Sequence, residues 1–127
     1  MKFDHAGIAT RDVESTADRL GALLQAPIVH EERFEGMSVV FLELDDGYLE
    51  LLEPQEGGAI DTYLSRNGPG THHLALATDD IEGALERARS QGIRLIDEEP
   101  RPGAWGHQVA FLHPKSTEGV LIEFVQH

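Results

Sequence analysis

Four side chains combine the residue types and the placement that metal chemistry requires. His5 and His73 lie in two similar segments, and Glu50 and Glu123 each stand within a run of apolar residues. Burying a carboxylate among apolar residues is costly unless charge or hydrogen bonds compensate. Two such carboxylates together with two paired histidines therefore predict one shared cation. Imidazole and carboxylate ligands suit zinc, cobalt, nickel or manganese better than calcium or magnesium.

The two histidines belong to a repeat that extends along the chain. Residues 4–14, DHAGIATRDVE, match residues 72–82, HHLALATDDIE, at an offset of 68 (73 − 5). Each window predicts a strand that leads into a helix, because Asp12 and Asp80 are good N-cap residues. The apolar residues that follow each cap recur with the 3.6-residue period of a helix. The repeat therefore predicts two copies of one structural module.

The apolar runs after each helix predict strands. In the first half, residues 39–42 and 48–52 flank Asp46-Gly47, which is a strong signal for a short hairpin. In the second half, residues 109–112 and 120–125 flank a longer loop. Each half thus has the order strand, helix and three strands. Neither half would bury its sheet face alone, so we expect the halves to pack together.

The boundaries of the modules follow from composition. Residues 54–70 are rich in Gly, Pro and polar residues, which indicates a linker, and a short helix is expected at 59–66. We predict an α+β fold in a single domain of 127 residues, with module one at 1–53 and module two at 71–127.

Charge and cysteine content restrict the partners. The chain carries 23 acidic and 10 basic residues, a net charge of −13, which argues against nucleic acid or anionic membrane. Cysteine is absent, so disulfides and thiolate metal sites are excluded. With no apolar leader after Met1, we expect a cytoplasmic protein. The acidic excess is typical of a halophilic protein, although an ordinary acidic cytosolic protein is the alternative.

Other histidines give weaker signals. His72 should point to the face opposite His73, because side chains alternate along a strand. His30, His107 and His113 have no partner in the other half of the repeat. We interpret His72 as a structural residue or as one that supports the ligands, and we assign no role to the other three.

Several segments together resemble the vicinal oxygen chelate (glyoxalase/bleomycin-resistance) superfamily and, within it, the methylmalonyl-CoA epimerase family. The resemblance covers almost the whole chain. The block HPKSTEGVLIE at 113–123 is the most specific, and the others are DHAGIA at 4–9, ELLEP at 50–54, HHLA at 72–75 and GIRLIDEEPRPG at 92–103.

The resemblance implies two paired βαβββ modules that form an incomplete eight-stranded, cup-shaped half-barrel, usually in a homodimer. It implies a divalent transition metal held by His5, His73 and Glu123, with Glu50 as the fourth ligand. The implied reaction interconverts (R)- and (S)-methylmalonyl-CoA by removing and returning the α-proton through an enolate. A divalent cation stabilises such an enolate as charge develops. Glu123 is our candidate for one base.

The chain departs from the family at one position of consequence. Val39 aligns with a glutamate that serves some relatives as a second base, and valine cannot carry a proton. Glu43 lies on the same face of that predicted strand and is one alternative. Coenzyme A is a polyanion, so an acidic protein needs local cationic or hydrogen-bonding groups to bind it. Lys115, Ser116 and Arg101 are our candidates for substrate binding.

Two other functions remain open. A glyoxalase I-type lactoylglutathione lyase uses the same two-histidine, two-glutamate ligand set. A non-catalytic module that binds small ligands, often without metal, is the second alternative. The segments 98–100 and 113–116 resemble the epimerases more than glyoxalase I.

Overall fold

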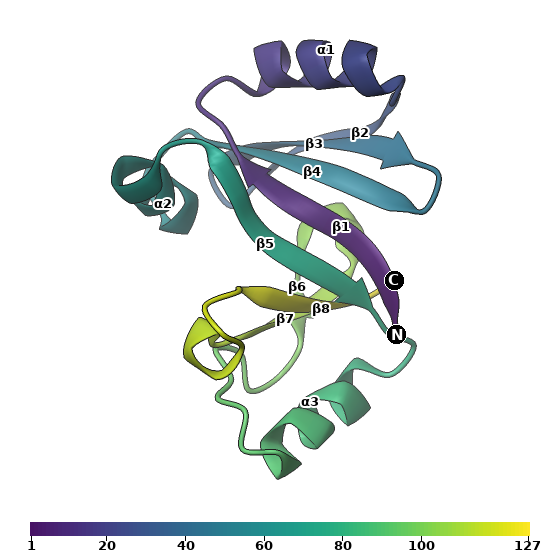
Figure 1. Ribbon diagram of the computed structural model, residues 1–127, viewed down its shortest axis with the longest axis vertical. Helices are drawn as coiled ribbons and strands as arrows, with labels where there is room; N and C mark the ends of the chain where they lie inside the picture. The colour runs from purple at the N-terminus through teal and green to yellow at the C-terminus, as the bar shows by residue number, and fades with distance from the viewer. The chain divides into compact units, whose positions relative to one another are not determined.

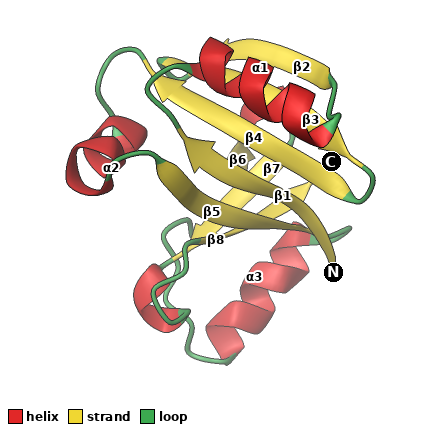
Figure 2. Cartoon of the chain, turned by 45° about the horizontal axis from the view of Figure 1, so that its top comes forward, coloured by secondary structure: helices red, strands yellow, loops and turns green.

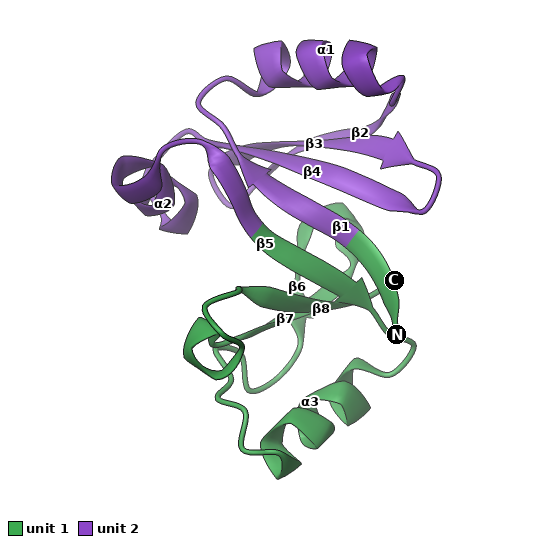
Figure 3. Ribbon diagram, in the orientation of Figure 1, with its two compact units in different colours: residues 1–4, 73–127 green, residues 5–72 purple.

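A computed structural model describes residues 1–127 of the chain, which divide into two compact units (Figure 3). Unit 1 contains residues 1–4 and 73–127, and unit 2 contains residues 5–72. The division falls within the strands β1 and β5, so each of these strands contributes residues to both units. Figures 1 and 2 show the helices and strands that make up the units.

Unit 2 holds the elements of the first module. In chain order these are β1 (Lys2–Ala9), α1 (Val13–Leu24), β2 (Ile28–Phe34), β3 (Met37–Leu44), β4 (Gly47–Pro54) and α2 (Ala59–Asn67). The strands lie in the order β2-β3-β4-β1, where β3 is antiparallel to both neighbours and β4 is parallel to β1. The hairpin between β3 and β4 and the short linker helix are therefore as predicted.

Unit 1 repeats this arrangement. Its elements are β5 (Gly70–Ala77), α3 (Ile81–Ser90), β6 (Arg101–Pro102), the 3-10 turn η1 (Ala104–Gly106), β7 (Gln108–Leu112), the 3-10 turn η2 (Pro114–Ser116) and β8 (Ile122–Gln126). The strands lie in the order β6-β7-β8-β5, again with two antiparallel pairs followed by a parallel pair. The predicted α+β fold with two βαβββ modules is confirmed.

Matching caps start the two main helices. Asp12 accepts a hydrogen bond from the backbone N–H of Ser15 at 3.0 Å, and Asp80 accepts one from Gly83 at 3.0 Å. An N-cap side chain satisfies one of the backbone donors that the first helical turn leaves without a partner. Asp12 and Asp80, which the repeat identified, therefore both cap the N-terminus of the helix in their module.

Each helix is also tied to the last strand of its own module. The N–H of Val13 donates to Glu53 Oε1 at 2.8 Å, and the N–H of Ile81 donates to Gln126 Oε1 at 2.9 Å. Both acceptors come three residues after the buried glutamate of their strand. These bonds fix where the last strand lies against the helix, and so they help to fix the position of that glutamate.

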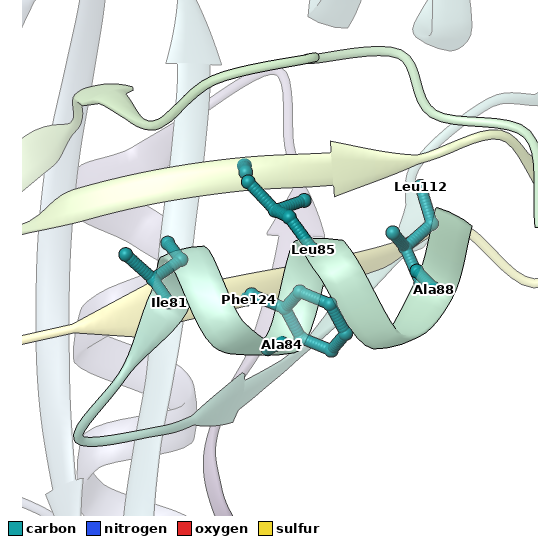
Figure 4. Close-up of a cluster of buried hydrophobic side chains, with 7 residues drawn as sticks. Ile81, Ala84, Leu85, Ala88, Leu112 and Phe124 are labelled. Carbon is teal, nitrogen blue, oxygen red and sulfur yellow. The ribbon is translucent and has the colours of Figure 1, made fainter. Parts of the chain in front are cut away.

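A separate hydrophobic core holds each helix on its sheet. In unit 2 the buried cluster is Ala17, Ala26, Val40, Leu42 and Leu51. In unit 1 residues of α3 pack against β7 and β8, as Figure 4 shows, in a cluster of Ile81, Ala84, Leu85, Ala88, Ala110, Leu112 and Phe124.

The sixth strand is much shorter than its counterpart in the first module. β6 has only Arg101 and Pro102, whereas β2 has seven residues. Upstream of it the chain contacts β7 through an isolated bridge between Leu95 and Leu112 and through hydrogen bonds that the N–H groups of Ile96 and Asp97 donate to the Phe111 carbonyl. Pro100 and Pro102 have no backbone N–H to donate to a ladder, which limits strand pairing here.

None of the three α-helices is long and apolar enough to cross a lipid bilayer.

We expect Leu85→Ala to destabilise the protein by about 2–5 kcal/mol, because it removes a side chain that is only 1% exposed and leaves a cavity under α3. Leu23→Ala is the matched control in α1, where the side chain is 73% exposed, and it should change stability by about 0.5 kcal/mol or less. Urea unfolding followed by circular dichroism measures both. Equal destabilisation by the two changes would contradict this account of the core.

Candidate metal centre

In unit 2 the strand register brings His5 and Glu50 together. β1 and β4 run parallel with Gly7 opposite Glu50, and His5 lies two residues before Gly7 on the same face of the strand. His5 Nε2 is 3.3 Å from Glu50 Oε1. The two residues are only 4% and 6% exposed, respectively. Unit 2 therefore holds a buried imidazole–carboxylate pair.

Unit 1 holds the equivalent pair. β5 and β8 run parallel with Ala75 opposite Glu123, and His73 lies two residues before Ala75. His73 Nε2 is 3.4 Å from Glu123 Oε1, and these residues are also buried. The same register thus builds the same pair in both modules.

A phenylalanine completes each pair, and the sequence interpretation missed it. Phe41 is the register partner of Glu50, and its ring lies edge-on to His5, with centroids 5.8 Å apart at 84°. Phe111 is the partner of Glu123 and meets His73 in the same way, at 5.5 Å and 81°. The signal was present in the sequence, since Val-Val-Phe-Leu and Val-Ala-Phe-Leu recur at an offset of 70 (111 − 41).

The donor set and its spacing fit a transition metal. Ligands about 2.1 Å from a tetrahedral zinc lie about 3.4 Å from one another, which is close to the two nitrogen–oxygen separations of 3.3 and 3.4 Å. Imidazole nitrogen with carboxylate oxygen is also the ligand combination that suits such ions. The residues present are therefore able to hold the cation that the sequence predicted.

Arg101 lies on the same face as the pair of unit 1. It is the register partner of Val109, which is two residues from Phe111 along β7. Its guanidinium carbon lies 5.5 Å from the centroid of the Phe111 ring, and its Nε is 3.0 Å from Asp97 Oδ1. A cation over an aromatic face and beside a carboxylate is held in one orientation. Of the predicted substrate-binding residues, Arg101 is the one that the strand register associates with the pair.

Ser116 and Lys115 lie in the turn after β7. Ser116 Oγ accepts a hydrogen bond from the backbone N–H of Arg94 at 2.9 Å. The Lys115 N–H donates to His113 Nδ1 at 3.1 Å, and the Lys115 side chain is exposed. Both contacts stabilise the turn, and they leave the ammonium group at the surface.

The remaining histidines have local partners. His72 points away from His73 and meets the ring of Tyr63 on α2 edge-on at 5.1 Å, as the alternation of the strand predicted. His127 Nε2 lies 2.5 Å from Asp4 Oδ1. His30, which sequence spacing did not single out, lies 3.3 Å from Glu32 on β2.

Comparisons with known proteins cover nearly the whole chain. It is 37% identical to a mitochondrial methylmalonyl-CoA epimerase of Dictyostelium discoideum, over 96% of this chain and 76% of that protein. It is also 37% identical to an ethylmalonyl-CoA/methylmalonyl-CoA epimerase of Cereibacter sphaeroides, over 98% of this chain and 97% of that one. A solved structure of a methylmalonyl-CoA epimerase in complex with methylmalonyl-CoA and NH4+ superimposes with a TM-score of 0.94 at 36% identity, covering 98% of this chain and 93% of the other.

A family model gives the wider assignment. Residues 4–111 match the model of the glyoxalase/bleomycin resistance protein/dioxygenase superfamily, and this range includes His5, Glu50 and His73. The duplicated strand register and the repeated histidine–glutamate–phenylalanine groups agree with that match. The chain therefore belongs to the glyoxalase/bleomycin resistance protein/dioxygenase superfamily.

Proposed function

We propose that the protein is a metal-dependent methylmalonyl-CoA epimerase that interconverts the (R) and (S) forms of its substrate. The observation that carries this proposal is the buried histidine–glutamate pair, built twice by the same register. Relatives named as epimerases of this substrate, at 37% identity over nearly the full chain, support the choice of reaction.

In this proposal His5, Glu50, His73 and Glu123 hold one divalent transition ion, so the two pairs act as a single site. Such an ion supplies Lewis-acid stabilisation of the enolate that forms when the α-proton leaves. Either pair alone leaves a carboxylate buried beside a single imidazole, whereas a shared cation balances both carboxylates.

The side chains themselves position the substrate and move the proton. Glu123 takes the α-proton onto a carboxylate oxygen and returns it, as a general base and acid. Phe41 and Phe111 keep water away from the two pairs, which strengthens the electrostatic interactions there. The Arg101 guanidinium binds a carboxylate or phosphate of the substrate, and Lys115 with Ser116 meets the phosphates of coenzyme A.

The proposal also covers the oligomeric state and the cellular conditions in which the protein works. We propose a homodimer in the cytoplasm. We also propose that the protein works in elevated salt, since a net charge of −13 is characteristic of proteins that tolerate such conditions. Sedimentation in low and high salt tests the dimer, and a salt titration of turnover tests the adaptation.

Incubation of methylmalonyl-CoA with the protein in deuterated water should introduce deuterium at the α-carbon and interconvert the epimers. Removal of metal by a chelator should abolish both, and readdition of cobalt, zinc, nickel or manganese should restore them. Mass spectrometry and chiral analysis measure the two events. Turnover of the glutathione–methylglyoxal adduct in place of methylmalonyl-CoA would instead favour a lactoylglutathione lyase, and full ligand affinity without metal or exchange would favour a binding module.

His73→Ala should remove a metal ligand, so bound metal should fall well below one ion per chain. His72→Ala is the matched control, because the neighbouring ring packs on Tyr63 on the opposite face. Elemental analysis of both purified variants, with circular dichroism as a check of folding, separates the two. Equal metal content would rule out the proposed site.

Glu123→Gln should lower epimerisation by about 10²–10⁴-fold, the range typical for loss of a general acid–base group. Because Glu123 is also a proposed ligand, metal content must be measured on the same sample. Glu118→Gln, in the loop before β8, is the control and should keep normal turnover. Undiminished activity in Glu123→Gln would exclude Glu123 as base.

A further inference from the structure

The second strand carries an ionisable pair that the proposed reaction has not yet used. His30 Nε2 lies 3.3 Å from Glu32 Oε1, and about a quarter of each side chain is exposed, 26% and 27%. The two residues stand at i and i+2 of β2, so both side chains point to the same face of the sheet.

The strand register identifies that face as the one that carries Glu50. His30 is the partner of Phe41, and Phe41 is in turn the partner of Glu50. Paired residues on neighbouring strands point to the same side of a sheet, so these three residues form one row. With strands about 4.8 Å apart, the His30 Cα lies about 10 Å from that of Glu50.

Ring contacts follow the same row. Phe41 lies between His5 and His30, since its ring centroid is 5.8 Å from that of His5 and 6.1 Å from that of His30. His30 is therefore separated from the proposed metal ligand by one aromatic ring.

Other groups on this face are less suited to proton transfer near neutral pH. On β3 the position opposite Glu32 is Val39, which is buried and cannot ionise. Glu43 lies on the same face but is exposed, four residues from Val39 and close to the end of the strand. Tyr48, the register partner of His5, packs its ring edge-on against Phe41, with centroids 6.1 Å apart.

We propose that His30, oriented by Glu32, is the second proton-transfer group of this enzyme and serves the face of the substrate opposite to Glu123. This proposal rests on the proposed epimerase function. An imidazole carries one nitrogen that accepts a proton and one that donates a proton, so the ring is able both to take up and to return the α-proton. Glu32 acts as a positioning residue, because its carboxylate oxygen lies 3.3 Å from Nε2 of the ring on the same face of β2.

The proton balance is complete without another reactant. In one direction the Cα–H bond of methylmalonyl-CoA breaks, its electron pair passes into the thioester carbonyl as the enolate, and His30 takes the proton. Glu123 then protonates the opposite face of Cα, and the electron pair returns to form the new C–H bond. The reverse reaction exchanges the two roles.

The test follows each epimer separately in deuterated water with metal-loaded enzyme. His30→Gln should lower epimerisation by about 10²–10⁴-fold, while deuterium still enters one of the two epimers through Glu123. Loss of epimerisation with retained exchange at one epimer is a result that a purely structural role of His30 does not produce. Glu32→Gln should lower kcat with little change in KM, and Glu32→Asp should restore part of the rate.

Control variants decide between this proposal and its competitors. Glu31→Gln, an exposed neighbour on the other face of β2, should behave as the unsubstituted protein. Normal epimerisation by His30→Gln, or loss of exchange at both epimers in a folded, metal-loaded His30→Gln, would overturn the proposal. One-sided exchange in Glu43→Gln or Tyr48→Phe instead would also overturn it. If the unsubstituted protein fails to epimerise methylmalonyl-CoA, the proposed function itself is wrong, and the role of His30 falls with it.

Discussion

The constraint on which the structure depends is the burial of a carboxylate beside an imidazole, made once in each module. Glu50 and Glu123 are each only 6% exposed, and an ionised carboxylate at such a position needs compensation by charge and hydrogen bonds. Both lie on a central strand, between an antiparallel and a parallel neighbour. A register slip of one residue would turn either glutamate to the helix-covered face. The helix caps and the hydrogen bonds that Glu53 and Gln126 accept therefore support the position of each glutamate as well as the stability of each module.

The modules differ most where duplication no longer constrains them, at their edge strands. The residue opposite Val39 on β2 is Glu32, whereas the residue opposite the equivalent Val109 on β6 is Arg101. One module thus offers a carboxylate with a histidine beside it, and the other offers a guanidinium held by Asp97. This asymmetry suits the proposed epimerase, because the α-proton must leave from one face of the substrate and return to the other, while separate cationic groups bind the negative charges of the substrate.

Sequence alone could predict the parts that repetition or strong local patterns encode. The offset between His5 and His73 predicted both modules and both caps, and it drew attention to the two histidines. His30 was missed because it has no counterpart at the repeat offset, and its relation to Glu50 passes through two strand registers that no local pattern encodes. The shortness of β6 was also missed, although Pro102 gave a signal, because single prolines are common at strand ends. The repeat in the sequence therefore identifies the residues that both modules share, but it gives no information on residues that occur in one module only.

The acidic composition bears on how a polyanionic substrate reaches the protein. A net charge of −13 repels coenzyme A at long range, but salt near 0.15 M screens charges beyond about 8 Å, and higher salt screens them further. Affinity for the substrate then has to come from short-range contacts. The Arg101 guanidinium, which is fixed over the Phe111 ring, is proposed to make one of them. Salt weakens such a contact less than one with a fully exposed charge. An acidic surface with a few fixed cationic groups is therefore compatible with an acyl-CoA substrate, and it becomes more so as the ionic strength rises.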